Sequence, residues 1–194
     1  MKLLGAPASP FVRKVRVLAL ELGLDLPFET VATATSAELP LANPLAKIPT
    51  LLRDDGPAIY DSPVICDYLN ALAGGSLVPA SGEARWRALT LEALADGLCD
   101  AAVWRRGESL RPAEVQNADA MAKQARLVAR ALAALEAQVE TFTGFGVGEI
   151  AAACAVAYLD FRFAGEPWRP AHPKLAAGFA RVSDRASMKA TAPD

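Results

Sequence analysis

The spacing of hydrophobic and polar positions divides the chain into two parts with different periods. In the first 75 residues, short apolar or β-branched runs predict four strands, at residues 2–5, 26–33, 50–52 and 58–60. Apolar residues three and four apart predict helices at 10–22 and 63–73. A further short helix at 35–42 is left open, because Pro40 limits its length. The resulting order, βαβαββα, is typical of an α/β domain.

The second part of the chain has no strand pattern and is rich in alanine, which favours helices. Helices are predicted at about 83–106, 113–140, 147–163 and 173–183, followed by a loose tail at 187–194. A short stretch with a proline and small polar residues separates the two parts. We therefore predict an α/β domain at 1–75, a linker at 76–82 and an all-α helical bundle domain at 83–194.

Two helices of the first domain begin in a similar way. Ser9 stands where an N-cap belongs, and Pro10 takes the first helical position, where its missing N–H costs nothing. Ser62 and Pro63 repeat this pattern, again after a strand. Helix N-termini attract anions, so a thiolate, carboxylate or phosphate would be stabilised at either end. The alternative is that Ser9 is only a capping residue.

Composition narrows the classes of function. The 194 residues are 53% hydrophobic with a formal net charge of −2, and no basic cluster points to a nucleic-acid partner. Three separated cysteines and a single histidine, His172, offer neither metal-ligand spacing nor a Ser-His-Asp triad, so we expect no metal. Cys66 and Cys154 lie in apolar runs and are expected in the core of a cytoplasmic protein. No signal peptide is expected, and the longest apolar run is too short to cross a membrane.

Four segments together resemble the cytosolic glutathione transferases, most of all the small bacterial transferase-like proteins of the YibF type. They are Ser9-Pro10-Phe11, Asn43-Pro44-Leu45-Ala46-Lys47-Ile48-Pro49, Asp61-Ser62-Pro63-Val64-Ile65 and residues 152–162. The resemblance implies a thioredoxin-like first domain, a helical second domain and a homodimer. Gly146 and Glu149 match part of the capping box that opens the family's central helix.

The resemblance also implies roles for particular residues. Ser9 is similar to the hydroxyl that activates the glutathione sulfur, and Ile48, before a cis Pro49, is similar to the residue whose backbone pairs with the cysteinyl part. The other glutathione contacts that it implies are Phe11, Lys47, Asp61 and Ser62. Trp104 and Arg105 would line the site of the second substrate if the two domains form a cleft.

These features predict a glutathione transferase that joins the glutathione thiolate to a largely apolar electrophile. One hydrogen bond to a charged acceptor contributes about 1.5–3 kcal/mol. Ser9 and its helix could thus supply most of the roughly 2.7 kcal/mol needed to lower a thiol pKa by about two units. Two departures from the family pattern are Asp61, where many relatives have Glu or Gln, and Ala46, where Gly is frequent.

Two other functions remain open at this point. One is a non-catalytic interaction protein of the same fold, similar to the stringent-starvation proteins. The other is a glutathione-dependent peroxidase or reductase, although thiol-disulfide exchange would favour a cysteine in place of Ser9.

Charged residues outside these motifs have simpler expectations. Arg13, Lys14 and Arg16 are expected on a solvated helix face. Asp96 and Asp100 are expected to be salt-bridge partners, and the alternative implied by the resemblance is an approach to the glutathione of a partner subunit.

Overall fold

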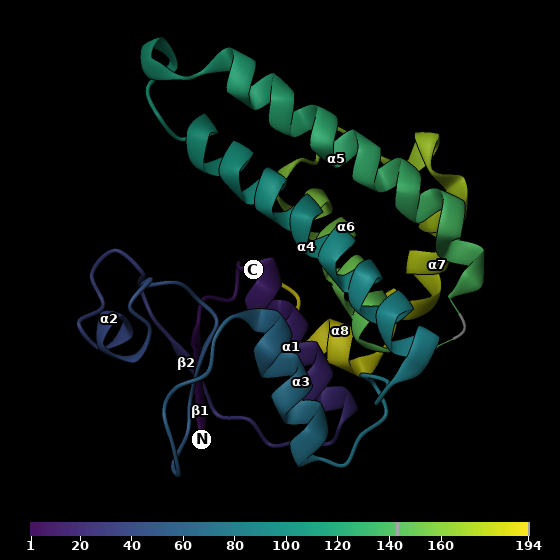
Figure 1. Cartoon of the computed structure of the whole chain (residues 1–194). Coiled ribbons are helices and arrows are strands. Elements are labelled where there is room, and N and C mark those ends of the chain that lie inside the picture. The colour runs from purple at the N-terminus through teal and green to yellow at the C-terminus, as the bar shows by residue number, and fades with distance from the viewer. Residues whose placement is uncertain (143, 194) are drawn as a thin grey trace.

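A small sheet with helices on its faces is followed by a helical bundle (Figure 1). The computed structural model describes residues 1–142 and 144–193. The first part contains β1 (Lys2–Gly5), α1 (Pro10–Glu21), β2 (Phe28–Thr30), α2 (Glu38–Ala42), β3 (Thr50–Leu52) and α3 (Ser62–Leu72). The second contains α4 (Gly82–Ser109), η1 (Ala113–Val115), α5 (Ala118–Gln138), η2 (Val139–Thr141), α6 (Val147–Arg162), η3 (Arg169–Ala171), α7 (Pro173–Ser183) and α8 (Ala186–Ala190).

The sheet has the strand order β2-β1-β3. β1 pairs in parallel with β2, with Leu3 opposite Phe28, and antiparallel with β3, with Leu4 opposite Thr50. The strand predicted at 26–33 is shorter than expected. The strand predicted at 58–60 is wrong in extent, because only a single antiparallel bridge joins Leu51 to Ile59. The predicted α/β order is otherwise confirmed, and the short helix left open at 35–42 is present as α2.

The helix starts differ in one respect from the prediction. Ser9 is the N-cap of α1, as expected, and its side chain accepts a hydrogen bond from the Val12 N–H. Ser62 is not an N-cap. It is the first residue of α3, and Asp61 takes the capping position without a side-chain hydrogen bond to the helix. Pro63 therefore lies one position further inside the helix than predicted.

Helix α6 is central to the molecule because both cores share it. One face packs with apolar residues of α4, α5 and α7, and the other face packs with α1 and the sheet. Its residues Val147 to Leu159 are buried with the one exception of Glu149, which is half-buried. The Glu149 carboxylate accepts a hydrogen bond from the Gly146 N–H at 3.1 Å, which confirms the acidic half of the predicted capping box. None of the described helices is both long and apolar enough to span a membrane.

The prediction of a loose tail at 187–194 is wrong for residues 187–191, which form helix α8 and its C-cap. Helix α8 lies along α1 (Figure 1), with Ser187, Met188 and Thr191 buried. The Arg13 guanidinium donates to the Met188 carbonyl at 3.0 Å and to the Thr191 hydroxyl at 3.4 Å. At the other end of α1, Glu21 accepts hydrogen bonds from Arg185 and Ser187. The tail is ordered because it satisfies charged groups at both ends of α1.

The predicted solvated face of α1 is also wrong. Arg13 is 7% exposed and Lys14 only 1% exposed. Arg16 is half-buried and lies over the Phe28 ring, 4.5 Å from its centroid. The charge pattern misleads because these side chains contact α4, α8 and β2 rather than solvent.

Candidate functional site

Two loops meet at one edge of the sheet. Because Leu4 pairs with Thr50, the loop that follows β1 lies beside the loop that precedes β3. The first loop leads into α1 at Ser9, and the second carries Lys47, Ile48 and Pro49. The carboxyl end of β1 and the N-terminus of α1 thus form the kind of crevice in which α/β sheets bind ligands.

Ser9 presents a hydroxyl at this edge. Its Oγ lies 3.4 Å from the Val12 amide nitrogen, so one lone pair caps α1 and the O–H remains available to donate. Gly5 brings the strand end close to this turn, because a Cβ at position 5 would lie 2.7 Å from a Val12 methyl carbon. Ser9 itself is half-buried, which leaves one side of the hydroxyl accessible.

The loop before β3 is held in place by the buried side-chain amide of Asn43. Asn43 is 1% exposed and donates to the Lys47 carbonyl at 3.0 Å and to the Thr50 hydroxyl at 3.1 Å, while its own carbonyl accepts from the Leu45 N–H at 3.0 Å. Thr50 in turn donates to the Lys47 carbonyl at 2.8 Å. The sequence motif contains Asn43, but its bracing role was not predicted, because only the structure reveals these partners.

The same loop contains the predicted cis peptide bond, between Ile48 and Pro49. Ala46 has a φ of 50°, in the left-handed region where a side chain is disfavoured. A glycine would adopt this backbone conformation without the steric cost that a Cβ brings. Lys47 is exposed, and Ile48 is half-buried against the core of the first part of the chain.

The start of α3 adds a carboxylate. Asp61 is exposed and makes no capping bond, so its oxygens are available to an external donor. Ser62 is 2% exposed and lies at the positive end of α3. Helix α3 packs against both α1 and β3, which brings its N-terminus to the same edge as the two loops.

The charges of Lys47 and Asp61 act on acidic groups of helix α4. Burial raises the pKa of the Asp100 carboxyl, Lys47 opposes that shift, and the charge of Asp61 adds to it. The charge of Asp61 also contributes to the raised pKa values of Glu92 and Asp96, after burial and the opposing effect of Lys14. Lys47 and Asp61 in the first part of the chain are therefore close enough to α4 for their charges to act on it.

A buried ion cluster lies behind the site. The Lys14 ammonium donates to Glu92 at 2.8 Å and to Asp96 at 2.6 Å, with the Lys14 and Glu92 side chains 1% and 3% exposed. Burial disfavours the Lys14 charge, but the two carboxylates more than offset it and hold its pKa above the ordinary value. For Asp96, the salt-bridge interpretation is confirmed. No sequence signal distinguishes this buried lysine from a solvated one, since its partners are about 80 residues away.

Three predicted residues belong to the helical part of the chain or pack against it. Phe11 packs against the core of the helical part. Trp104 is 39% exposed on α4. Arg105 is mostly buried, donates to both oxygens of Glu166 at 2.7 and 3.0 Å, and lies over the Phe163 ring. The contacts of Arg105 are thus structural, and a role of these three residues in ligand binding stays a prediction.

The cysteines do not provide reactive thiols. All three are buried, as predicted for Cys66 and Cys154. Burial raises the pKa of Cys154 to about 12 and the pKa values of Cys66 and Cys99 well above their ordinary range. His172 immediately precedes α7, as predicted. Within residues 1–142 and 144–193, no group of acidic, histidine and cysteine side chains is arranged to hold a metal ion.

Comparison with known proteins gives a consistent picture along the chain. The family model of the glutathione S-transferase N-terminal domain matches residues 3–77, and that of the C-terminal domain matches residues 118–177. The uncharacterized GST-like protein YibF of Escherichia coli K12 is 34% identical over 200 residues, covering 100% of this chain and 98% of that protein.

Solved structures agree with these matches. A glutathione transferase family member from Pseudomonas fluorescens Pf-5 with bound glutathione is 44% identical, with a TM-score of 0.95 and coverage of 100% of this chain and 98% of that chain. A second structure of a family member from this organism, with bound S-(propanoic acid)-glutathione, is 44% identical, with a TM-score of 0.91 and full coverage of both chains. The predicted thioredoxin-like and helical fold is therefore confirmed, and the chain belongs to the glutathione S-transferase family.

Proposed function

We propose that this protein binds glutathione at the edge formed by Ser9, the Lys47–Pro49 loop and the start of α3, and joins the glutathione sulfur to an electrophilic carbon. The observation that carries this proposal is the Ser9 hydroxyl, which caps α1 through its oxygen and keeps its proton free to donate. Glutathione as the ligand is supported by structures of family members with bound glutathione and with bound S-(propanoic acid)-glutathione. In that conjugate the glutathione sulfur is joined to carbon, as in the product of a transfer reaction.

The chemical task of Ser9 is to stabilise a thiolate. A free thiol with a pKa near ~8.5 is mostly protonated at neutral pH. A hydrogen bond from Ser9 to the sulfur, together with the positive end of α1, favours the anion by about 2–4 kcal/mol. The thiol proton passes to water, the thiolate attacks the electrophilic carbon, and the sulfur–carbon bond forms. In a substitution the electron pair leaves with the leaving group, and in an addition it passes into the acceptor, which then takes a proton from water. Ser9 keeps its own proton throughout.

The rest of the tripeptide has complementary partners. The backbone of Ile48 would pair with the cysteinyl part, and Lys47, an exposed cation, would meet the glycyl carboxylate. The free carboxylate of Asp61 would receive the γ-glutamyl ammonium, while Ser62 and the N-terminus of α3 would receive its carboxylate. Phe11 orients the first turn of α1 against the helical part. Trp104 and Arg105 remain the proposed lining of the co-substrate site.

Binding is tested by calorimetry with glutathione and with its S-methyl derivative at millimolar concentration. The thiol pKa of bound glutathione is then measured by ultraviolet thiolate absorbance. We expect saturable binding and a thiol pKa about two units below that of free glutathione. Lack of binding would favour the interaction-protein alternative, and binding with an unshifted pKa would remove the proposed role of Ser9.

The variant Ser9→Ala separates activation from binding. We expect conjugation to fall by one to three decades, because a few kcal/mol of thiolate stabilisation is lost. Asn117→Ala removes the N-cap of α5, whose Oδ1 accepts from Ala120 N–H at 2.9 Å, and serves as the matched control. Both variants lose a cap, but only Ser9→Ala should raise the bound thiol pKa, and Ser9→Thr should restore part of the activity.

The assembly and the location of the protein follow from the same proposal. We propose a homodimer that uses glutathione in the cytoplasm, where this thiol is kept reduced. Light scattering tests the dimer, and a screen of activated aryl halides, isothiocyanates and α,β-unsaturated acids tests the co-substrate class. We also propose that the domain boundary lies between α3 and α4, within the predicted linker at 76–82.

A further inference from the structure

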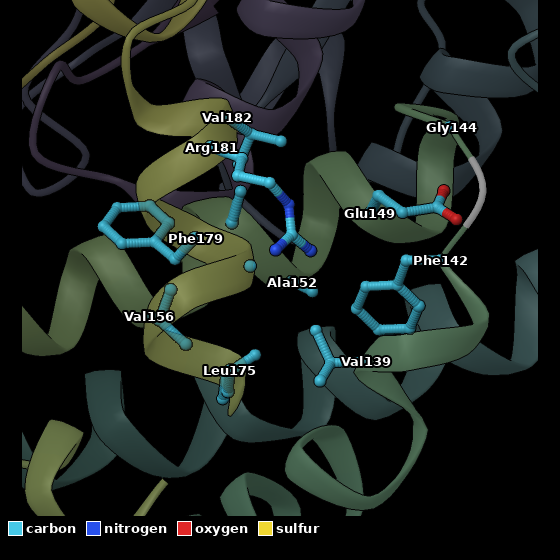
Figure 2. A pocket seen from close by; sticks show the side chains of 12 residues that line it. Val139, Phe142, Gly144, Glu149, Ala152, Val156, Leu175, Phe179, Arg181 and Val182 are labelled. Carbon is cyan, nitrogen blue, oxygen red and sulfur yellow. The ribbon is translucent and has the colours of Figure 1, made fainter. Parts of the chain in front are cut away.

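An apolar pocket opens between α6, α7 and η2 in the helical part of the molecule (Figure 2). None of the residues of the candidate glutathione site lines it. Its walls are largely aliphatic and aromatic and come from Val139, Phe142, Val156, Leu175, Phe179 and Val182. The proposed transferase reaction does not need this pocket, so its occupant is a separate question.

The pocket exists because small residues form its floor. Ala152 and Ala153 on α6 face it, where longer side chains would fill the space. Helix α7 approaches η2 closely at Gly178, since a Cβ there would lie 2.7 Å from a Val139 methyl carbon. This contact fixes the position of the pocket rim, while the short alanine side chains of α6 leave space at its floor. A ligand with a compact apolar body would recover van der Waals contacts that the empty space lacks.

One cation reaches into this apolar space. Figure 2 shows the Arg181 side chain extending from α7 so that its guanidinium group lies over Ala152, between the α7 wall and Phe142. Arg181 is an exposed residue, and none of the hydrogen bonds and ion pairs found among the described residues involves its guanidinium. The guanidinium can therefore exchange water for an anion, and it binds a carboxylate through two parallel hydrogen bonds.

The acidic residue of the pocket does not compete for Arg181. Glu149 lines the opposite side, and its carboxylate points away from Arg181, toward the segment at Gly144 (Figure 2). It accepts the hydrogen bond from the Gly146 N–H that caps α6. The pocket thus has an apolar floor, a capping carboxylate that already has a donor, and a guanidinium directed inward.

We propose that this pocket binds a small monocarboxylate with an alkyl or aryl body. The apolar body would lie on Ala152 and Val156, and the carboxylate would pair with Arg181. A cationic ligand would meet Arg181 unfavourably, and a neutral one would leave the exposed guanidinium hydrated without gaining an ion pair. The site is independent of Ser9, so it can be occupied together with glutathione.

The test compares three ligands with the same apolar body: hexanoate, hexan-1-ol and hexylammonium. Calorimetry on the full-length protein, saturated with glutathione, measures each affinity. We expect hexanoate to bind at one site per chain and at least tenfold more tightly than the alcohol. No binding of hexylammonium is expected. Perturbed methyl resonances of Val139, Val156 and Leu175 would place hexanoate in the pocket.

Two variants make the assignment specific. Arg181→Gln should reduce hexanoate affinity at least tenfold and leave the alcohol unchanged, whereas Arg130→Gln, at an exposed position of α5, should change neither. Ala152→Leu should abolish binding of both ligands by filling the floor. Equal affinity for acid and alcohol, or hexanoate binding that survives Arg181→Gln, would overturn the proposal. Loss of hexanoate binding in Ser9→Ala would mean that the ligand occupies the transferase site instead.

Discussion

The ion cluster of Lys14, Glu92 and Asp96 allows a sharp prediction about stability. Replacing Lys14 by Met keeps most of the side-chain volume and removes the charge. Two carboxylates would then remain in the interior, one 3% and the other 18% exposed, without the cation that both contact. Removing one partner of a buried ion pair destabilises proteins by about 3–5 kcal/mol, because the remaining charge is uncompensated. We expect a loss of that size in Lys14→Met.

The loss should depend on pH in a defined direction. Burial already holds the pKa values of Glu92 and Asp96 above their ordinary values of 4.5 and 3.8, although Lys14 pulls both down. Without Lys14 the folded-state pKa values rise further. A carboxyl whose folded pKa lies above its unfolded pKa destabilises the folded state as pH rises through that window. The deficit of Lys14→Met should therefore be largest near pH 8 and shrink toward pH 5.

Urea denaturation followed by circular dichroism, at several pH values, measures this deficit. For a chain of this size a loss of 3–5 kcal/mol corresponds to a fall in Tm of roughly 6–20 °C. Adding Glu92→Gln to Lys14→Met should restore much of the stability, because one of the two unpaired charges is removed. A deficit below about 1 kcal/mol, or one that does not change with pH, would refute the view that Lys14 compensates buried charge.

Three further predictions concern other contacts. Asn43→Ala should lower the free energy of unfolding by about 2–3 kcal/mol and also weaken glutathione binding. Asn70→Ala removes three comparable hydrogen bonds to Leu77 and Val78, and it should lower stability by a similar amount while glutathione affinity stays unchanged. Denaturation measures the stability of both variants, and calorimetry measures their glutathione affinity. Ala46→Gly should be neutral or slightly stabilising, whereas Ala46→Val should cost about 1–2 kcal/mol in denaturation, since φ is 50°. Arg13→Met should speed hydrogen exchange in α8 more than in α5, and equal protection in α8 would argue against the Arg13 anchor.

The sequence predicted the structure correctly where residues close together in the chain determine it. The Ser9-Pro10 start of α1, the boundaries of α7 and the Gly146–Glu149 cap of α6 all follow from residues within one helical turn. Hydrophobic period likewise separated the α/β part from the helical part. These features are predictable because the interacting groups are close in sequence.

The errors lie where distant residues decide the outcome. A tail that begins at Ser187 has no strong helix signal, but α1 supplies partners for it more than 160 residues away. Lys14 looks solvated because basic residues alternate with apolar ones around it, and its carboxylates are on another helix. The predicted strand at 58–60 is reduced to one bridge, because a three-residue apolar run alone does not extend a ladder. Tertiary contacts override propensity in each case.

The errors on α1 bear directly on the proposed chemistry. Ser9 is positioned by the first turn of α1, and the charged side chains of this helix are attached to the helical part, through Lys14 to α4 and through Arg13 to α8. Phe11, two residues after Ser9, packs into that same part. The direction in which the Ser9 hydroxyl points is thus set by the docking of the two parts, not by the sheet alone. Because a hydrogen bond weakens steeply with misalignment, we expect small shifts at this interface to weaken the proposed hydrogen bond from Ser9 to the glutathione sulfur. We therefore expect substitutions at Lys14 and Arg13 to affect the proposed thiol site, although neither side chain needs to touch glutathione.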